Sequence, residues 1–405
     1  MSYEAPYREY KVVDLSQGIA GPYCGMLLAL KGADVIKVEP PSGDWSRYLG
    51  TVYGDHSAVS TSYNRGKRSI AIDLKTPEGR DIVGRLIAGC DILIEGYRPD
   101  VAARIGMSYA EVKRVNPKVL YVSVSGFGQR GPYAQLPLSD SVAQAFSGLM
   151  SINLGCDGIP HRIGTTIVDA VTGLFAFQAL AAALFAREIG AEPEGCHLDI
   201  SLMQSAAAIQ APTIAAYYLE GGPPQPLNAP AGSYRTKDGW ITISFVKEEE
   251  FQRFCEAIEC ETLPSDPRFS TFLQRAKNIE ALIEILAQTF ARKTTEEWII
   301  RLKAADLLHA RINDYGDWLA DTHVRSVGAV TVRTQPGVGK IPTPNIPGQV
   351  KVGAGDTMNL APAIGEHTRE ILSEFGYTDE EIEALGRKWI VRLQPKENRR
   401  ESNEQ

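Results

Sequence analysis

The stretch KVVDLSQGIAGPYCGMLLALKGADVIKVE (residues 11–39) has the pattern of a strand, a helix and a second strand. Residues 11–15 and 33–39 are rich in the β-branched apolar side chains that buried strands favour. Between them, glycines mark a turn and residues 26–30 form an apolar helical segment. A helix that joins two strands in this way makes them parallel and covers one face of their sheet. The stretch therefore predicts an α/β domain.

Similar units follow along the first half of the chain. Short β-branched strands are expected at residues 69–74, 91–95 and 119–125. A helix is expected to open at Thr76-Pro77, because proline suits the first helical turn. This alternation of strands and helices predicts a doubly wound α/β domain.

The pattern changes at GGPPQP (residues 221–226), whose composition is that of a turn-rich linker. Beyond it we expect a strand at 239–245 and amphipathic helices in the regions 248–258, 278–291 and 295–304. The predicted organisation has three parts: a large Rossmann-like domain at 1–220, a small α+β domain at 225–325, and a segment at 330–405. That last segment is expected to hold a linker and C-terminal helices, two of them in residues 366–386.

Composition bounds the function. The 405 residues are 44% hydrophobic and 22% charged, as in ordinary globular proteins, and the net charge of −7 argues against a nucleic-acid partner. No uncharged apolar run reaches the roughly 18 residues of a membrane span, and the N-terminus lacks the pattern of a secretory signal. The six cysteines form no CxxC pair and the six histidines no metal-binding pair. We expect a cytoplasmic protein with reduced thiols, no metal site and no membrane partner.

Asp169 stands between the β-branched run 165–168 and the strongly apolar segment 174–185. The run favours an extended backbone and the segment a buried helix. An aspartate at such a junction is expected to cap the helix and to interact with the positive end of its dipole. From the residues alone, a capping role and a catalytic role both stay open.

A dinucleotide fingerprint must be weighed first. GFGQRG (residues 126–131) matches GxGxxG after a strand, but Pro132 and Pro137 prevent the long helix that this motif requires. It is interpreted as a glycine-rich active-site loop. Glu39 stands where an NAD enzyme carries its ribose acid, yet the preceding glycines have the wrong spacing. NAD binding is therefore not expected.

Two further motifs are basic. YNRGKRS (residues 63–69) brings three cations to the start of a strand, and GYRP (96–99) follows a strand and precedes Arg104. Arginine can bind phosphate bidentately, and Tyr and Arg can stack on a purine. Each motif alone is equally compatible with a solvated basic loop.

Taken in order, the motifs SQGIAGPYCGMLLALKGADVIKVEPPSGD, YNRGKRSIAIDLKTPEGR, ILIEGYRPDVAARIG, VSGFGQRGPY and IGTTIVDAVTG resemble the class III CoA-transferase family, which contains formyl-CoA:oxalate and carnitine CoA-transferases. GCHLDISLMQ, DPRF and GEHTREIL continue the resemblance to residue 372. It implies an enzyme that moves CoA from an acyl-CoA donor to a small carboxylic acid. It also implies that residues 1–220 are the first part of a Rossmann-like, CoA-binding large domain, that the C-terminal helices in 330–405 complete this domain, and that two chains interlock as rings in a homodimer.

The resemblance assigns residues to roles. Asp169 is implied as the nucleophile, which forms an aspartyl anhydride and then an aspartyl-CoA thioester, and Asp140 as a second, supporting acid. No permanently bound cofactor is implied, since CoA is a substrate. The positions implied to contact CoA are Gln17, Ile19, Ala20, Ile72, Lys75, Gly96, Tyr97, Arg98 and Arg104. The helix terminus at Asp169 is expected to keep that carboxylate ionised.

Two departures from the family pattern stand out. Residues 228–234 lack the glycine run with which some members close the site, and Pro40-Pro41 replace arginines that bind the CoA phosphates in some relatives. Arg65, Lys67, Arg68 and Arg104 are expected to supply that charge instead.

Two alternatives remain. One is an α-methylacyl-CoA racemase, which needs a His–Asp pair to exchange a proton, although residues 131–136, directly after the SGFGQ segment, contain no histidine. The other is a non-catalytic acyl-CoA-binding relative, against which the intact Asp169 motif argues.

Overall fold

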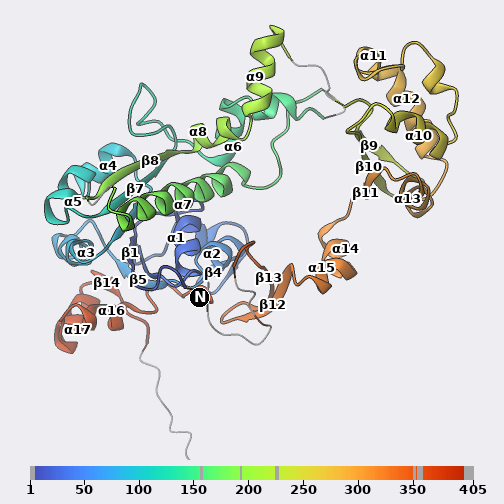
Figure 1. Ribbon diagram of the computed structural model, residues 1–405. Coiled ribbons are helices and arrows are strands. Elements are labelled where there is room, and N and C mark those ends of the chain that lie inside the picture. The colour runs from blue at the N-terminus through green and yellow to red at the C-terminus, as the bar shows by residue number, and fades with distance from the viewer. Residues whose placement is uncertain are drawn as a thin grey trace, which may run out of the picture. The chain divides into compact units, whose positions relative to one another are not determined.

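The structure is a computed structural model that describes residues 5–155, 158–191, 194–223, 228–349, 353 and 359–395. It divides the chain into two compact units (Figure 1). The first comprises the described residues up to Ala211 together with those from Gly328, and the second comprises Pro212–Val327. The chain thus leaves the first unit, builds the second and returns.

The first unit is built on a seven-stranded sheet with the order β14-β5-β2-β1-β6-β7-β8. Its six parallel strands are β1 (Lys11–Asp14), β2 (Asp34–Glu39), β5 (Arg68–Ile72), β6 (Ile92–Glu95), β7 (Leu120–Ser125) and β8 (Cys196–Ser201). Numbered along the chain they run 3-2-1-4-5-6, the order of doubly wound nucleotide-binding sheets. The order reverses between β1 and β6, so the loops after these two strands diverge and leave a crevice.

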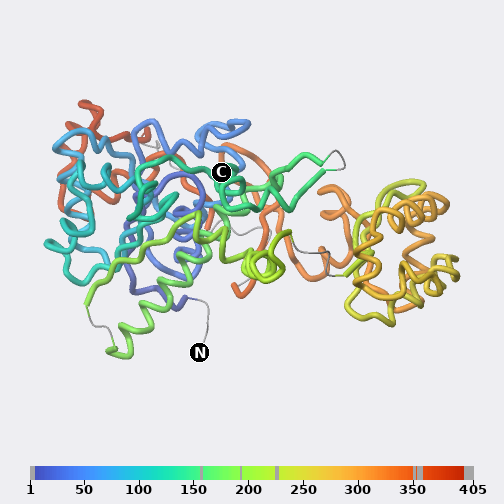
Figure 2. The backbone as a smooth tube through the Cα atoms, turned by 90° about the horizontal axis from the view of Figure 1, so that it is seen from above, coloured from blue at the N-terminus to red at the C-terminus, as the bar shows by residue number. Residues whose placement is uncertain are grey.

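Helices cover both faces of this sheet. One face packs against α3 (Pro77–Ala88), α16 (Thr368–Glu374) and α17 (Asp379–Arg387). The other packs against α1 (Ala20–Ala29), α7 (Ile167–Glu188) and α8 (Leu202–Ala208). The edge strand β14 (Val391–Arg392) pairs antiparallel with β5, and Figure 2 shows the C-terminal segment lying among the N-terminal ones. Residues far apart in sequence therefore share one apolar core.

Helix α7 corrects two expectations. It begins at Ile167, inside the run that was expected to be a strand, because two of its free N–H groups bind the Asp140 carboxylate. It is also not buried all round, since Leu174 is 44% and Phe185 66% exposed. By length and composition it could cross a membrane, but it packs against α1 so closely that a Cβ on Gly173 would lie 2.7 Å from the Ala20 carbonyl oxygen. We interpret α7 as a helix of the α/β unit with one exposed apolar side.

The second unit has an antiparallel sheet in the order β11-β10-β9, made of β9 (Gly232–Arg235), β10 (Trp240–Ser244) and β11 (Leu308–Arg311). Three helices pack on it: α10 (Glu250–Ala257), α12 (Ile279–Phe290) and α13 (Thr295–Ala304). The buried rings of Phe254, Phe290 and Trp298 hold them together.

The remaining elements are short. The helices are α2 (Ala58–Tyr63), α4 (Pro99–Arg104), α5 (Tyr109–Val115), α6 (Asp140–Phe146), α9 (Ala211–Glu220), α11 (Phe272–Lys277), α14 (Tyr315–Ala320) and α15 (Thr322–Ser326). The strands are the pair β3 (Val52–Tyr53) and β4 (His56–Ser57) and the hairpin β12 (Val330–Gln335) and β13 (Gly339–Pro344).

Candidate active site

The loop between β1 and α1 rests on buried charges. The Asp44 carboxylate accepts a hydrogen bond from the Gly18 N–H (3.0 Å) and pairs with the Lys37 ammonium at 2.8 Å. Gly18 has φ +85°, and a Cβ there would lie 2.3 Å from the Trp45 ring. Only glycine satisfies both the positive φ and the close approach. The hydrogen bond to Asp44 and the contact with the Trp45 ring therefore hold the loop in one conformation.

A cavity of about 300 Å³ lies where the loops after β1 and β6 meet the start of α7. It occupies the crevice at the reversal of strand order, where α/β sheets bind ligands. Seven of the predicted site residues line it: Gln17, Ile19, Ala20, Gly96, Tyr97, Arg98 and Asp169. The structure thus brings the residues from these three segments together.

Two further cavities adjoin the first, because Gln17 and Tyr97 line all three. One, of about 320 Å³, contains Arg104. The other, of about 940 Å³, contains Ile72 and Lys75. All predicted CoA-contact positions therefore lie along one series of cavities, which we call the switch-point trench.

The basic motif at residues 63–69 does not contribute to this trench. Lys67 is buried and its ammonium pairs with Asp14 at 2.8 Å, while Arg68 binds Asp34, Glu370 and Glu374. Arg65 lines a different cavity. The expectation that Lys67 and Arg68 serve CoA phosphates is wrong, because the fold uses both in ion pairs, and Arg65 lies outside the trench. Arg80, which the sequence analysis missed, lies beside Lys75 in the largest of the three trench cavities.

Asp140 and Asp169 meet at the start of α7 with different tasks. One Asp140 oxygen accepts the N–H groups of Val168 (2.8 Å) and Asp169 (3.2 Å), and the other accepts the Gln144 side-chain amide at 2.6 Å. Gln144 in turn accepts the Ile163 N–H at 2.8 Å. Asp140 is therefore the buried group that caps the helix. The Asp169 carboxylate, which was expected to cap it, is left for another use.

The electrostatics of Asp169 also differ from expectation. Burial, and then the negative charge of Asp140, raise the pKa of Asp169 to about 7. Among the described residues, no group donates a hydrogen bond to its carboxylate. The helix N-terminus does not keep Asp169 ionised, because Asp140 already occupies the N–H groups. What remains is a poorly solvated carboxylate at one end of the trench.

A family model described as CoA-transferase family III matches residues 7–368. The chain belongs to this family. It is 33% identical over 393 residues to the mouse succinyl-CoA:glutarate CoA-transferase, covering 94% of this chain and 89% of that protein. It is 31% identical to succinyl-CoA–D-citramalate CoA-transferase of Chloroflexus aurantiacus, covering 95% and 98% of the two chains.

A solved structure agrees with the fold. The crystal structure of a CAIB/BAIF family protein from Brucella suis superposes with a TM-score of 0.79 at 30% identity, and the match covers 92% of this chain and 99% of that one. This family III CoA-transferase is thus a mixed α/β enzyme that transfers CoA between acyl-CoA thioesters and carboxylic acids.

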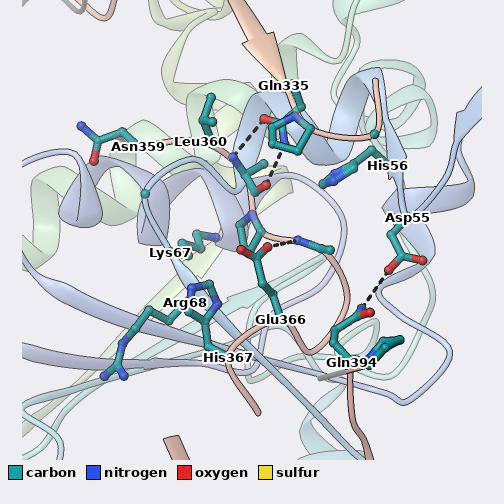
Figure 3. A pocket seen from close by; sticks show the side chains of 17 residues that line it. Asp55, His56, Lys67, Arg68, Gln335, Asn359, Leu360, Glu366, His367 and Gln394 are labelled. Carbon is teal, nitrogen blue, oxygen red and sulfur yellow. Dashed lines mark hydrogen bonds between the residues drawn. The ribbon is translucent and has the colours of Figure 1, made fainter. Parts of the chain in front are cut away.

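Another cavity in the first unit is distinct from the trench (Figure 3). It measures about 820 Å³ and is lined by Asp55, His56, Glu366 and His367, none of them a predicted site residue. Several of its polar groups bind one another or the backbone; the Gln394 side-chain amide, for example, donates to Asp55. In the part of the chain that the structure describes, no three His, Cys, Asp or Glu side chains are grouped to hold a metal ion.

Proposed function

We propose that Asp169 is the nucleophile of this CoA-transferase and that the switch-point trench binds the acyl-CoA. The observation that carries the proposal is that Asp169 shares a cavity with the loops after β1 and β6, at the reversal of strand order. A carboxylate in that position has no other structural task, since Asp140 caps the helix.

The dimensions and chemistry of the trench suggest how CoA lies in it. The thioester is placed in the cavity of about 300 Å³ beside Asp169, and the pantetheine arm passes between Gln17 and Tyr97, which line every cavity of the trench. Arg98 and Arg104 along the way, and Lys75 and Arg80 at the far end, supply positive charge for the phosphates.

The proposed chemistry moves acyl groups without moving protons. An Asp169 oxygen attacks the donor thioester carbon, the C–S bond breaks, and CoA leaves as a thiolate, which gives a mixed anhydride of Asp169 and the donor acid. The thiolate then attacks the Asp169 carboxyl carbon, which releases the donor acid and gives an aspartyl-CoA thioester. An acceptor carboxylate attacks that thioester and again expels the thiolate. The thiolate finally takes the acceptor acyl group from the new anhydride and regenerates the Asp169 carboxylate.

Every attacking and leaving group in this sequence is an anion, so no general base is required. Consistent with this, none of the described residues that line the trench cavities is a histidine. A racemase exchanges an α-proton and needs such a base. The lining of the trench therefore favours CoA transfer over racemisation.

For the substrates, we propose succinyl-CoA as a donor and a small carboxylic acid as acceptor. The support is that the mouse and Chloroflexus relatives are both named for transfer from succinyl-CoA. Because residues 228–234 lack the glycine run, we propose that this enzyme closes its site by a different segment or to a different extent.

We also propose that two chains form the interlocked, ring-like homodimer. The exposed apolar side of α7 supports an apolar partner, as does α9, which buries none of its residues and exposes Tyr218 and Leu219 by more than 80%. Light scattering is expected to give twice the mass of one chain. A cytoplasmic location is likewise proposed, because the five cysteines in the described residues are free thiols, Cys156 lying outside them.

Chemical trapping tests the mechanism. The enzyme is incubated with succinyl-CoA, treated with hydroxylamine or borohydride, digested and analysed by mass spectrometry. Hydroxylamine is expected to convert Asp169 to a hydroxamate, and borohydride to reduce it to the alcohol. The Asp169→Asn variant is the control and should carry no label. CoA exchange without label at Asp169 would refute the proposed nucleophile, and α-deuterium incorporation without CoA exchange would point to a racemase.

A further inference from the structure

A separate cavity of about 250 Å³ begins one residue beyond Asp169. It shares no lining residue with the cavity that holds Asp169. Its wall is formed by Ala170, by Tyr23 and Tyr63 with their rings edge to face, and by residues 341–344 of β13. Met26 and Ile341 add apolar surface. Among the described residues that line this cavity, Arg65 is the only charged one.

Arg65 is buried without an acidic partner. Arg65 is 6% exposed, its Nε has no hydrogen-bond partner, and its Nη1 donates a hydrogen bond to the Pro344 carbonyl oxygen at 3.4 Å. Among the described residues no carboxylate lies within ion-pair distance of it. Burial, and then the charge of Arg333, lower the pKa of this guanidinium. A buried cation in such surroundings is costly unless an anion joins it.

Tyr63 connects this cavity to Asp169. It lines the cavity, and it lies close enough to Asp169 for that charge to raise the Tyr63 pKa, after the larger effect of burial. Tyr63 therefore borders the Arg65 cavity and also lies near the Asp169 carboxylate.

We propose that the Arg65 cavity selects dicarboxylic acyl groups. Arg65 binds the distal carboxylate bidentately, while the proximal carboxyl carbon reaches Asp169 and the intervening methylenes lie against Met26, Ile341 and the tyrosine rings. The inference rests on the proposed role of Asp169. The same chemistry is offered by the distal end of a dicarboxylyl-CoA donor and by a free dicarboxylate acceptor.

Matched substrate pairs test the inference. Values of kcat/KM are measured for succinyl-CoA against butyryl-CoA as donor, and for glutarate against valerate as acceptor, so that each pair differs by one carboxylate. The wild-type enzyme is expected to prefer the dicarboxylate member. In Arg65→Met, kcat/KM for the dicarboxylate member is expected to fall about 100-fold, as when a buried charge pair is broken, and kcat/KM for the monocarboxylate member to change little. Arg65→Lys, which keeps the charge without the fork, should lie between.

The control is Arg114→Met, which removes an exposed arginine of α5 in the same unit and should leave both pairs unchanged. If Arg65→Met loses the dicarboxylate preference in the donor pair alone, the cavity binds the donor acyl group. If it loses the preference in the acceptor pair alone, the cavity binds the acceptor. Equal losses for both members of a pair, or a wild-type enzyme without preference, would overturn the inference. If Arg65→Met does not fold, as judged by CoA binding, the wild-type preference and Arg65→Lys decide.

The inference can be refuted while the proposed function of Asp169 still holds. Label at Asp169 from succinyl-CoA and butyryl-CoA at equal rates keeps Asp169 as the nucleophile but removes the selective role of Arg65. Absence of label from either donor removes the proposed mechanism itself.

Discussion

Two buried groups of charged side chains lie in the first unit, and they are treated in opposite ways. Beneath the β1–α1 loop, the cations are paired with acids: Lys37 with Asp44, Lys67 with Asp14, and Arg47 with Glu39. Around the start of α7, Asp169 accepts no hydrogen bond and Arg65 has no acid, among the residues that the structure describes. Beneath the β1–α1 loop, ion pairs within the protein compensate for the desolvation of each charge. Around the start of α7 we expect a bound ligand to provide that compensation.

The pKa shifts express the same contrast. Burial alone would raise the pKa of Asp14, but the ammonium groups of Lys67 and Lys37 bring it below its ordinary value. For Asp169 the neighbouring charge is another carboxylate, so burial and Asp140 act in the same direction and raise its pKa to about 7. A paired carboxylate stabilises the scaffold, whereas an unpaired one is available for chemistry.

The largest effect is expected from Asp169→Asn. An amide of the same shape cannot form the anhydride, so we expect CoA transfer to fall by about 10⁴-fold or more, which is roughly 5.5 kcal/mol of transition-state stabilisation. Binding of CoA, measured by calorimetry, should be unchanged, because in the proposed mechanism Asp169 contacts only the thioester end. Retention of even a tenth of the activity would place the nucleophile elsewhere.

The paired region should respond in stability instead. Lys67→Met leaves the Asp14 carboxylate buried and uncompensated, and we expect a loss of about 3–5 kcal/mol in the free energy of unfolding by urea. Lys113→Met, on the exposed side of α5, is the control and should change it by less than about 0.5 kcal/mol. Equal stability of the two variants would mean that the buried pair is not part of the scaffold.

The sequence predicted the sheet well, because its strands are continuous β-branched runs. The strands expected at residues 33–39, 91–95 and 119–125 are observed within a residue at each end. Strand β8 was not predicted, because CHLDIS alternates apolar and polar residues instead of forming a continuous β-branched run, and its place beside β7 depends on long-range pairing. The residues of the trench came from the family resemblance, which carries spatial information that periodicity does not.

The start of α7 could not be predicted locally. Residues 165–168 favour an extended backbone by intrinsic preference, and the helix begins there because Asp140, more than twenty residues earlier, accepts its N–H groups. The partners of the basic residues at 65–68 could not be predicted from the local sequence either. Whether a cation faces an acid or a cavity depends on partners such as Asp14 and Glu370, which lie far away in sequence.

Asp140→Asn sharpens the contrast by changing the charge but not the shape of the cap. In the wild-type enzyme the carboxylate is the reactive form, so kcat/KM should rise with pH through about 7 and then level off. Removing the Asp140 charge lowers the pKa of Asp169, and the rise should move to lower pH. The maximal rate should fall by about tenfold, because the amide nitrogen of the substituted side chain cannot accept the hydrogen bond that one Asp140 oxygen takes from Gln144. Asp81→Asn, on the exposed side of α3, should leave the profile in place.

The smallest effect concerns stability at Asp169 itself. Its pKa is raised from 3.8 to about 7 in the folded chain, so folding favours the protonated form. This contribution is fully present below about pH 4 and is lost as the pH rises through about 7, where the half-buried carboxylate becomes charged. An asparagine has no such charge. The Tm of Asp169→Asn relative to wild type should therefore increase between pH 4 and pH 8, by a few degrees at most. Calorimetry with Asp81→Asn as control checks this. A Tm difference independent of pH would show that the carboxylate is not buried at this cost, whereas a rising one would mean that the same unpaired charge limits stability and supplies the nucleophile.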